Sequence, residues 1–130
     1  MASHDSVMVV DDDPDLSDTL RMVLEHFGFE VTVAHDGREA LRLLEQGMPR
    51  VILLDMLMPI MSGWEFSEEY TRRFPEPRAA IVVLTAADDA RARALEVGAA
   101  AYLRKPFETR SLIDTVSRLI GPREPAHAST

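Results

Sequence analysis

Residues 51–55 read Val51-Ile52-Leu53-Leu54-Asp55, and the fold of the chain can be worked out from this segment. Four consecutive apolar residues are typical of a strand that is buried on both faces, as in the middle of a parallel sheet. An aspartate follows the last of them, and open parallel sheets bind their ligands at this end of their strands. The segment therefore predicts a central parallel strand with a carboxylate at the functional edge of the sheet.

Similar apolar runs occur on both sides of this strand and alternate with helical patterns. We predict strands at 7–10, 29–34, 51–54, 81–84 and 101–104. We predict helices at 14–27, from Asp36 to near Gly47, at 64–74, at 89–97, and over a last segment that stops at Gly121. Five successive strand–helix units predict an α/β fold with a parallel sheet, right-handed crossovers and helices on both faces.

Two of the predicted helices begin with capping residues. Asp13 precedes Pro14, which combines a favoured N-cap residue with a proline at the first helical position. Asp36 and Glu39 have the spacing of a capping box. These residues predict where the first and second helices begin.

The composition excludes several classes of protein. A length of 130 residues suits one domain with its own apolar core. The net charge of −8, from 14 basic and 22 acidic side chains, repels phosphate backbones, so we expect no direct binding to nucleic acid. The absence of cysteine excludes disulfides, thiolate catalysis and cysteine-ligated metals.

The hydropathy pattern predicts where the protein is located and where its domain begins and ends. No apolar run approaches the ~20 residues that span a bilayer, and the polar start of the chain lacks the apolar core of a signal peptide. We therefore expect a cytoplasmic protein that does not contact a membrane. We expect one domain over residues 6–121, a short extension at 1–5 and a flexible polar tail at 122–130. The tail is either the end of the protein or the start of a linker to a further domain.

Polar side chains follow four of the five predicted strands. Asp11 comes directly after the first strand, Asp55 after the third, Thr85 after the fourth and Lys105 after the fifth. Because the carboxyl ends of parallel strands lie at one edge of a sheet, these four groups are expected to meet there. Chance would place one or two polar groups at that edge, and four of them predict a site.

The chemistry of this set indicates phosphoryl transfer. Asp11, Asp12 and Asp55 would repel one another unless a cation joins them, and oxygen ligands suit a hard ion such as Mg²⁺, for which Mn²⁺ could substitute. A carboxylate is also a nucleophile toward phosphorus. Thr85 and Lys105 could hold the phosphoryl oxygens. Taken singly, Thr85 could also be a helix cap and Lys105 an ordinary surface lysine.

The chain strongly resembles the receiver, or phosphoacceptor, domains of two-component response regulators over about residues 6–121. The matching segments, which stand in the order and spacing of the family, are Val7-Met8-Val9-Val10-Asp11-Asp12-Asp13-Pro14, Leu53-Leu54-Asp55-Met56-Leu57-Met58-Pro59-Ile60-Met61-Ser62-Gly63, Val83-Leu84-Thr85-Ala86 and Lys105-Pro106-Phe107. The resemblance implies a flavodoxin-like (βα)5 fold, a doubly wound five-stranded parallel sheet with strand order 2-1-3-4-5.

The resemblance also implies an acceptor and a set of metal ligands. Asp55 is expected to be the phosphoacceptor. Asp12 is expected to bind Mg²⁺ directly and Asp11 through water, while the backbone carbonyl of Leu57 completes the protein ligands. Asp13 is not expected to bind the metal and is interpreted as a helix cap only.

Four further positions match the family in ways that imply a role. Lys105 is expected to pair with the acceptor and then with the phosphoryl group, aimed by a cis peptide bond before Pro106. Thr85 and Tyr102 are expected to be the switch hydroxyl and the switch aromatic residue. Ala86 is small where relatives need room for the phosphoryl group to enter.

Several positions depart from the common family pattern. Ser62 stands where aspartate is frequent, and Trp64 where a smaller apolar residue is more common. The segment 99–101 lacks an acidic residue that DNA-binding relatives use in a dimer on the face of their fourth helix, fifth strand and fifth helix, which argues against that dimer. Leu57 and Ala87 cannot hydrogen-bond an attacking water through their side chains, so we predict slow hydrolysis of the phosphoaspartate.

The prediction is therefore a receiver that accepts a phosphoryl group on Asp55 from a phosphohistidine of a sensor histidine kinase or histidine phosphotransfer protein. Phosphorylation would move Thr85 toward the phosphate and turn Tyr102 inward. The face of the fourth helix, fifth strand and fifth helix would then be read by an output partner or effector domain that the sequence does not identify. The chain would catalyse its own phosphorylation and dephosphorylation, without turning over an external substrate.

Two other functions are compatible with parts of the pattern. A phosphohydrolase of the haloacid-dehalogenase kind needs a second aspartate two residues after the nucleophile, where this chain has Leu57, and a cap domain for which there is no room. A receiver-like adaptor that works without phosphorylation usually lacks one of the acids, the threonine or the lysine. All of these are present, and the adaptor stays as the alternative.

Overall fold

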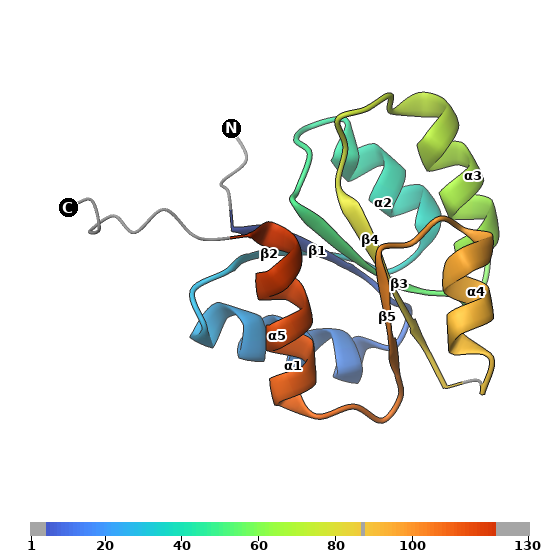
Figure 1. Cartoon of the computed structure of the whole chain (residues 1–130). Coiled ribbons are helices and arrows are strands. Elements are labelled where there is room, and N and C mark those ends of the chain that lie inside the picture. The colour runs from blue at the N-terminus through green and yellow to red at the C-terminus, as the bar shows by residue number, and fades with distance from the viewer. Residues whose placement is uncertain (1–4, 87, 122–130) are drawn as a thin grey trace.

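The computed structural model describes residues 5–86 and 88–121 (Figure 1). The strands are β1 (Ser6–Val10), β2 (Glu30–Ala34), β3 (Val51–Asp55), β4 (Ala80–Thr85) and β5 (Ala101–Arg104). The helices are α1 (Pro14–His26), α2 (Gly37–Leu44), α3 (Gly63–Arg73), α4 (Ala90–Glu96) and α5 (Thr109–Ile120). The predictions for the tail at 122–130, for the first four residues and for Ala87 lie outside the described residues.

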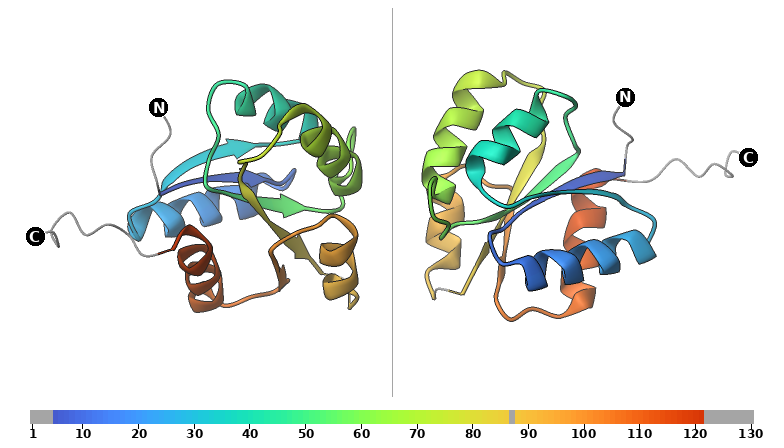
Figure 2. Two further views of the ribbon diagram at one scale, coloured as in Figure 1. Left: turned by 45° about the horizontal axis from the view of Figure 1, so that its top comes forward. Right: turned by 180° about the vertical axis from the view of Figure 1, so that it is seen from behind.

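The five strands form one parallel sheet in the order β2-β1-β3-β4-β5. Helices α1 and α5 lie together on one face of the sheet, and α2, α3 and α4 cover the other face (Figures 1 and 2). This arrangement confirms the predicted doubly wound, flavodoxin-like fold.

Alternate residues of the central strand feed two apolar layers. Val51 and Leu53 pack into the layer beneath α1 and α5, whereas Ile52 and Leu54 pack into the layer beneath α2, α3 and α4. All five residues of β3 are buried, because neighbouring side chains of a strand point to opposite faces and both faces are covered. The apolar run therefore needs no alternation with polar residues.

The two predicted caps are present, one of them with a shifted partner. Asp13 accepts a hydrogen bond from the N–H of Asp15 at 3.0 Å, and Asp36 accepts one from the N–H of Glu39 at 2.9 Å. The Glu39 carboxylate, however, accepts from the N–H of His35 at 2.7 Å. The second half of the capping box is therefore made one residue earlier than the sequence pattern predicts.

Helix α3 begins one residue earlier than predicted, at Gly63, because Ser62 caps it. The Ser62 hydroxyl accepts from the N–H of Glu65 at 3.2 Å, and the Glu65 carboxylate accepts from the N–H of Ser62 at 2.9 Å. Both halves of a capping box are thus present at a serine that the sequence pattern places in a loop.

The other ends lie within one residue of the prediction, except that α2 ends at Leu44, before the predicted end near Gly47. Strand β1 begins at Ser6, β2 begins at Glu30, and β4 extends by one residue at either end. Helix α4 is shorter by one residue at either end, and α1 ends at His26, so that Phe27 is exposed and does not join the apolar face. Within the described residues, no helix has both the length and the apolar character needed to cross a membrane.

Candidate functional site at the carboxyl edge of the sheet

The structure brings together the four polar groups predicted at the strand ends. Strand β1 leads into Asp11, β3 ends at Asp55, β4 ends at Thr85, and β5 leads into Lys105. The N–H of Lys105 donates to the carbonyl oxygen of Thr85 at 2.8 Å, which continues the pairing of β4 and β5 beyond the strands. The side chains of Asp11, Asp55 and Lys105 therefore meet at the predicted edge of the sheet, and Thr85 ends the strand beside them.

Three carboxylates form the centre of this site. One oxygen from each of Asp11, Asp12 and Asp55 lies within 4.8 Å of the other two. Asp11 is fully buried and is oriented by the N–H of Asp13, which donates to its Oδ1 at 2.9 Å. Asp55 is only 7% exposed, whereas Asp12 is open to solvent.

The environment of Asp55 opposes its negative charge. Burial raises the pKa of its carboxyl from 3.8 to about 6, and the neighbouring charges of Asp11 and, to a smaller extent, Asp12 act in the same direction. The Lys105 ammonium and the N–H of Leu57 lower this pKa in part. An oxygen cluster with this much uncompensated negative charge fits a hard divalent cation such as Mg²⁺.

Lys105 is the cation at the centre of the site. Its Nζ lies 3.3 Å from Asp11 Oδ2 and 3.8 Å from Asp55 Oδ1. The peptide bond between Lys105 and Pro106 is cis, as predicted. An ordinary surface position for this lysine is therefore wrong, since three-quarters of its side chain is covered.

Leu57 and Thr85 line the site in different ways. The N–H of Leu57 donates to Asp55 Oδ1 at 3.2 Å, while its side chain is 63% exposed. Thr85 is buried at the end of β4, and α4 begins only at Ala90, with Asp89 as the residue before it. Thr85 therefore does not cap α4.

Ala86 and Tyr102 occupy the periphery of the site. Ala86 is exposed beside Lys105, where both residues line the end of an apolar cleft of about 480 Å³ between α1 and α5. Tyr102 pairs with Val83 in the sheet and is 43% exposed. In the structure, then, Tyr102 is not in the inward position predicted for the phosphorylated state.

Sequence reasoning missed a close backbone contact behind the acceptor. The N–H of Gly63 donates to the carbonyl oxygen of Met56 at 3.0 Å. A Cβ atom at Gly63 would lie 2.6 Å from Met56 Sδ, 2.7 Å from Met56 Cα and 3.1 Å from the carbonyl oxygen of Asp55. A glycine in the first turn of a helix, where it is a poor helix former, is the sequence signal for such a contact.

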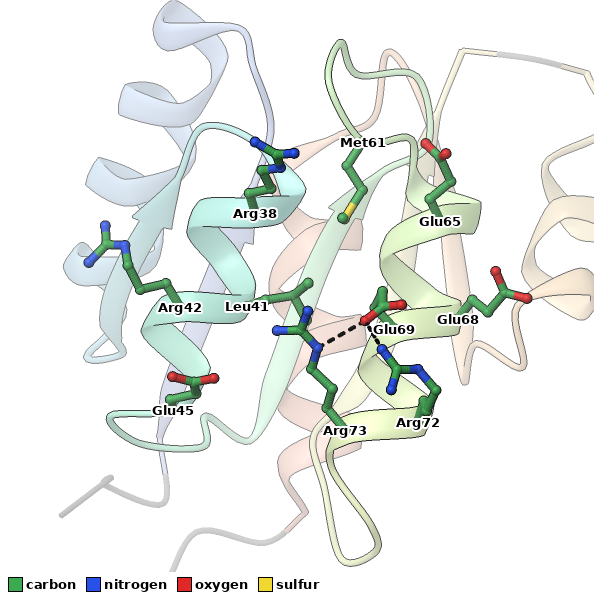
Figure 3. Close-up of a pocket in the computed structure, with 10 residues that line it drawn as sticks. All are labelled: Arg38, Leu41, Arg42, Glu45, Met61, Glu65, Glu68, Glu69, Arg72 and Arg73. Atoms are coloured by element: carbon green, nitrogen blue, oxygen red, sulfur yellow. Dashed lines mark hydrogen bonds and ion pairs between the residues drawn. The ribbon is translucent and has the colours of Figure 1, made fainter.

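A hollow of about 660 Å³ between α2 and α3 is not part of this site (Figure 3). Leu41 lies in it, and Arg72 and Arg73 both point to Glu69, to which they donate hydrogen bonds (Figure 3). Glu69 forms ion pairs with both arginines on its own helix, as is usual for solvated helix faces. The hollow therefore does not compete with the carboxylate cluster as a functional site.

Solved structures with this fold are similar to the chain over nearly its whole length. A chemotaxis protein of Vibrio cholerae, CheY4, is 32% identical over 88% of this chain and 97% of its own, with a TM-score of 0.79. The response regulator TrrA of Thermotoga maritima, solved in complex with Mg²⁺ and BeF, is 32% identical over the same shares, with a TM-score of 0.78.

The receiver domain of a sensor histidine kinase from Pseudomonas aeruginosa PAO1, solved with a magnesium ion coordinated in its active-site cleft, is also similar. It is 29% identical over 92% of this chain and all of its own, with a TM-score of 0.82. The family model of the response regulator receiver domain matches residues 7–117, which include every residue of the carboxylate site. With this match and the shared fold, the chain belongs to the response regulator receiver domain family.

Proposed function

We propose that this receiver takes up one phosphoryl group on Asp55 from the phosphohistidine of a sensor histidine kinase or histidine phosphotransfer protein. The observation that carries the proposal is the position of the Asp55 carboxylate, which lies within 4.8 Å of Asp11 and Asp12 oxygens and 3.8 Å from the Lys105 ammonium. A buried acid with two acids and a lysine around it is suited to receive a charged group rather than to stabilise the fold.

The transfer is a displacement at phosphorus. A carboxylate oxygen of Asp55 attacks the phosphorus atom, an O–P bond forms, and the P–N bond of the phosphohistidine breaks. Its electron pair returns to the imidazole nitrogen, the ring takes up one proton from water so that the donor leaves as neutral histidine, and Asp55 becomes an acyl phosphate. Lys105 and the Leu57 N–H favour the ionised carboxylate that this attack requires.

Asp11, Asp12, Asp55 and the backbone carbonyl of Leu57 would hold Mg²⁺, with Mn²⁺ as a substitute. The ion would supply positive charge for the oxygens of the transferred group. The donor set fits, because it contains only oxygen ligands and carries excess negative charge. The magnesium in the similar receiver from P. aeruginosa supports this assignment.

Thr85, Ala86 and Tyr102 complete the proposed switch. Thr85 would hold a phosphoryl oxygen through its hydroxyl, and the exposed position of Ala86 leaves room for entry. Tyr102 would turn inward from its exposed position, and the α4-β5-α5 face would change for a partner or effector domain. The domain would also hydrolyse its own phosphoaspartate, without acting as a turnover enzyme, and would work in the cytoplasm.

Intact mass after incubation with acetyl phosphate and Mg²⁺ tests the proposal. The wild-type domain should gain one phosphoryl group, about 80 Da. Asp55→Asn and wild type in EDTA are the controls, and neither should gain this mass. Absence of any gain with several phosphorylated donors would overturn the proposal in favour of the phosphorylation-independent adaptor.

A further inference from the structure

Helix α4 is weakly attached to the sheet. It has seven residues, and the two that it buries, Ala90 and Ala94, carry only methyl side chains. Leu95, its largest apolar residue, is 72% exposed. Since apolar stabilisation grows with the area removed from water, the sheet alone holds α4 less firmly than the longer helices.

Polar contacts with α3 supply the additional attachment. The indole N–H of Trp64 donates to Glu96 Oε1 at 2.8 Å, and the guanidinium of Arg93 lies over the indole ring, 5.2 Å from its centroid. The Ser67 hydroxyl donates to the carbonyl oxygen of Val97 at 3.2 Å. The middle and the C-terminal end of α4 are thus joined to α3, the helix beside it, which Figure 1 shows in green next to orange.

Arg93 is held in an incomplete set of hydrogen bonds. Its Nε donates to Asp89 Oδ1 at 2.9 Å. Asp89 is the N-cap residue of α4, and its side chain makes this contact instead of a cap hydrogen bond. Its Nη1 is buried and has no hydrogen-bond acceptor among residues 5–86 and 88–121. A buried donor without an acceptor is unfavourable, so this incomplete set offsets part of the stability that the contacts with α3 give to α4.

The same cluster is connected to both segments that leave the acceptor edge. Trp64 follows Gly63, which packs directly on the backbone of Met56 and Asp55. Asp89 stands four residues after Thr85, the last residue of β4. A displacement of the acceptor segment would therefore act on Trp64 through the close contact at Gly63.

We propose that Trp64, Arg93 and Glu96 form a latch, called here the α3–α4 latch, that holds α4 in the resting arrangement. Trp64 positions the other two residues, because its indole contacts both Glu96 and Arg93. This inference rests on the proposed function, because phosphorylation of Asp55 is the event that works against the latch. A contact that stabilises only the resting state lowers the affinity of the site for a phosphoryl group, and its removal raises that affinity by the same factor.

Titration with beryllofluoride in the presence of Mg²⁺, followed by calorimetry, measures this affinity without a covalent step. Trp64→Phe removes the indole donor and Arg93→Met removes the guanidinium. Each should bind beryllofluoride roughly five- to tenfold more tightly than wild type. Glu96→Gln keeps an acceptor for the indole and should keep the wild-type affinity. Arg72→Met, an arginine on α3 outside the latch, is the matched control and should also be unchanged.

Amide hydrogen exchange of the free domain gives a second measurement. In Arg93→Met the amides of residues 90–96 should exchange several-fold faster, while those of β3 keep their wild-type rates. A general loss of stability would instead weaken beryllofluoride binding and speed exchange in both elements.

Unchanged or weaker binding by both latch variants, beside a wild type that binds, would overturn the latch and leave the proposed function standing. A wild type that does not bind beryllofluoride would count against the proposed function itself. In that case the amide exchange rates of α4 would test the latch without the binding measurement. Equal rates in wild type and Arg93→Met would refute the latch.

Discussion

The ammonium nitrogen of Lys105 lies 3.3 Å from a carboxylate oxygen of Asp11 and forms a hydrogen bond with it. Asp55, the proposed acceptor, is farther from this nitrogen, at 3.8 Å. The lysine therefore neutralises chiefly the fully buried Asp11. It can turn to a phosphoryl group once another cation takes over that charge.

Replacing the lysine should make the acceptor harder to ionise. Because the Lys105 charge lowers the pKa of Asp55, Lys105→Met should raise this pKa further above its value of about 6. Carbon-13 NMR of the Asp55 carboxyl during a pH titration in EDTA measures the change. Lys105→Arg keeps the charge and should stay near the wild-type value. A lower pKa in Lys105→Met would contradict the assigned electrostatics.

Removing the acceptor charge should stabilise the metal-free fold. The pKa of Asp55 is raised from 3.8 to about 6 in the folded state, so the folded domain keeps this proton when the unfolded chain has released it. The contribution of Asp55 to the free energy of unfolding therefore falls as the pH rises from about 4 to about 6, and it stays low above that range. Asp55→Asn should be more stable than wild type by about 1–3 kcal/mol at pH 7.5.

Urea unfolding in EDTA at pH 4.5 and pH 7.5 checks this prediction. The gain of Asp55→Asn should shrink at the lower pH, where wild-type Asp55 is protonated in the folded domain. An equal gain at both pH values would assign the effect to packing instead of charge.

Leu57 offers a route to faster loss of the phosphoryl group. Its side chain is 63% exposed beside the acceptor and cannot hydrogen-bond water. An added hydrogen bond of about 1 kcal/mol to the attacking water predicts that Leu57→Asn shortens the phosphoaspartate lifetime about fivefold. The decay of the phosphorylated mass after donor removal measures this lifetime. Leu57→Met, which stays apolar, should match wild type, and an unaltered lifetime in Leu57→Asn would refute the idea.

Gly63 should tolerate no side chain. An added Cβ atom meets the Met56 backbone at 2.7 Å, so α3 has to move away from the acceptor segment. Gly63→Ala should lower the free energy of unfolding by about 1–3 kcal/mol, measured by urea unfolding. Gly47→Ala is the matched control, because nothing lies within 4 Å of a Cβ atom there. Equal stabilities of the two variants would mean that the close contact carries no strain.

Ile60 lies in the loop between β3 and α3 with a φ of 70°, a left-handed conformation that a β-branched residue rarely adopts. Its side chain is mostly exposed, so a replacement loses little burial. Asparagine accepts this conformation more readily, and Ile60→Asn should stabilise the domain by about 1 kcal/mol in thermal unfolding. Ile60→Ala shortens the side chain but keeps the unfavourable conformation, and it should show no comparable gain.

The order of the elements and the location of the site could be predicted from the sequence. Apolar runs that end in Asp11, Asp55, Thr85 and Lys105 were sufficient, because the carboxyl ends of parallel strands must share one edge of a sheet. The helix start at Asp13 followed from local hydrogen bonding, which depends only on neighbouring residues.

Other features depended on contacts between residues far apart in the chain. The pairing of Lys105 with Asp11, the raised pKa of Asp55 and the junction of Trp64 with Arg93 and Glu96 each join separate elements. Sequence spacing carries the identity of such groups, but not their distances or their burial. Electrostatic and hydrogen-bond energies vary steeply with both, so these relationships were decided only when the sheet and its helices had packed.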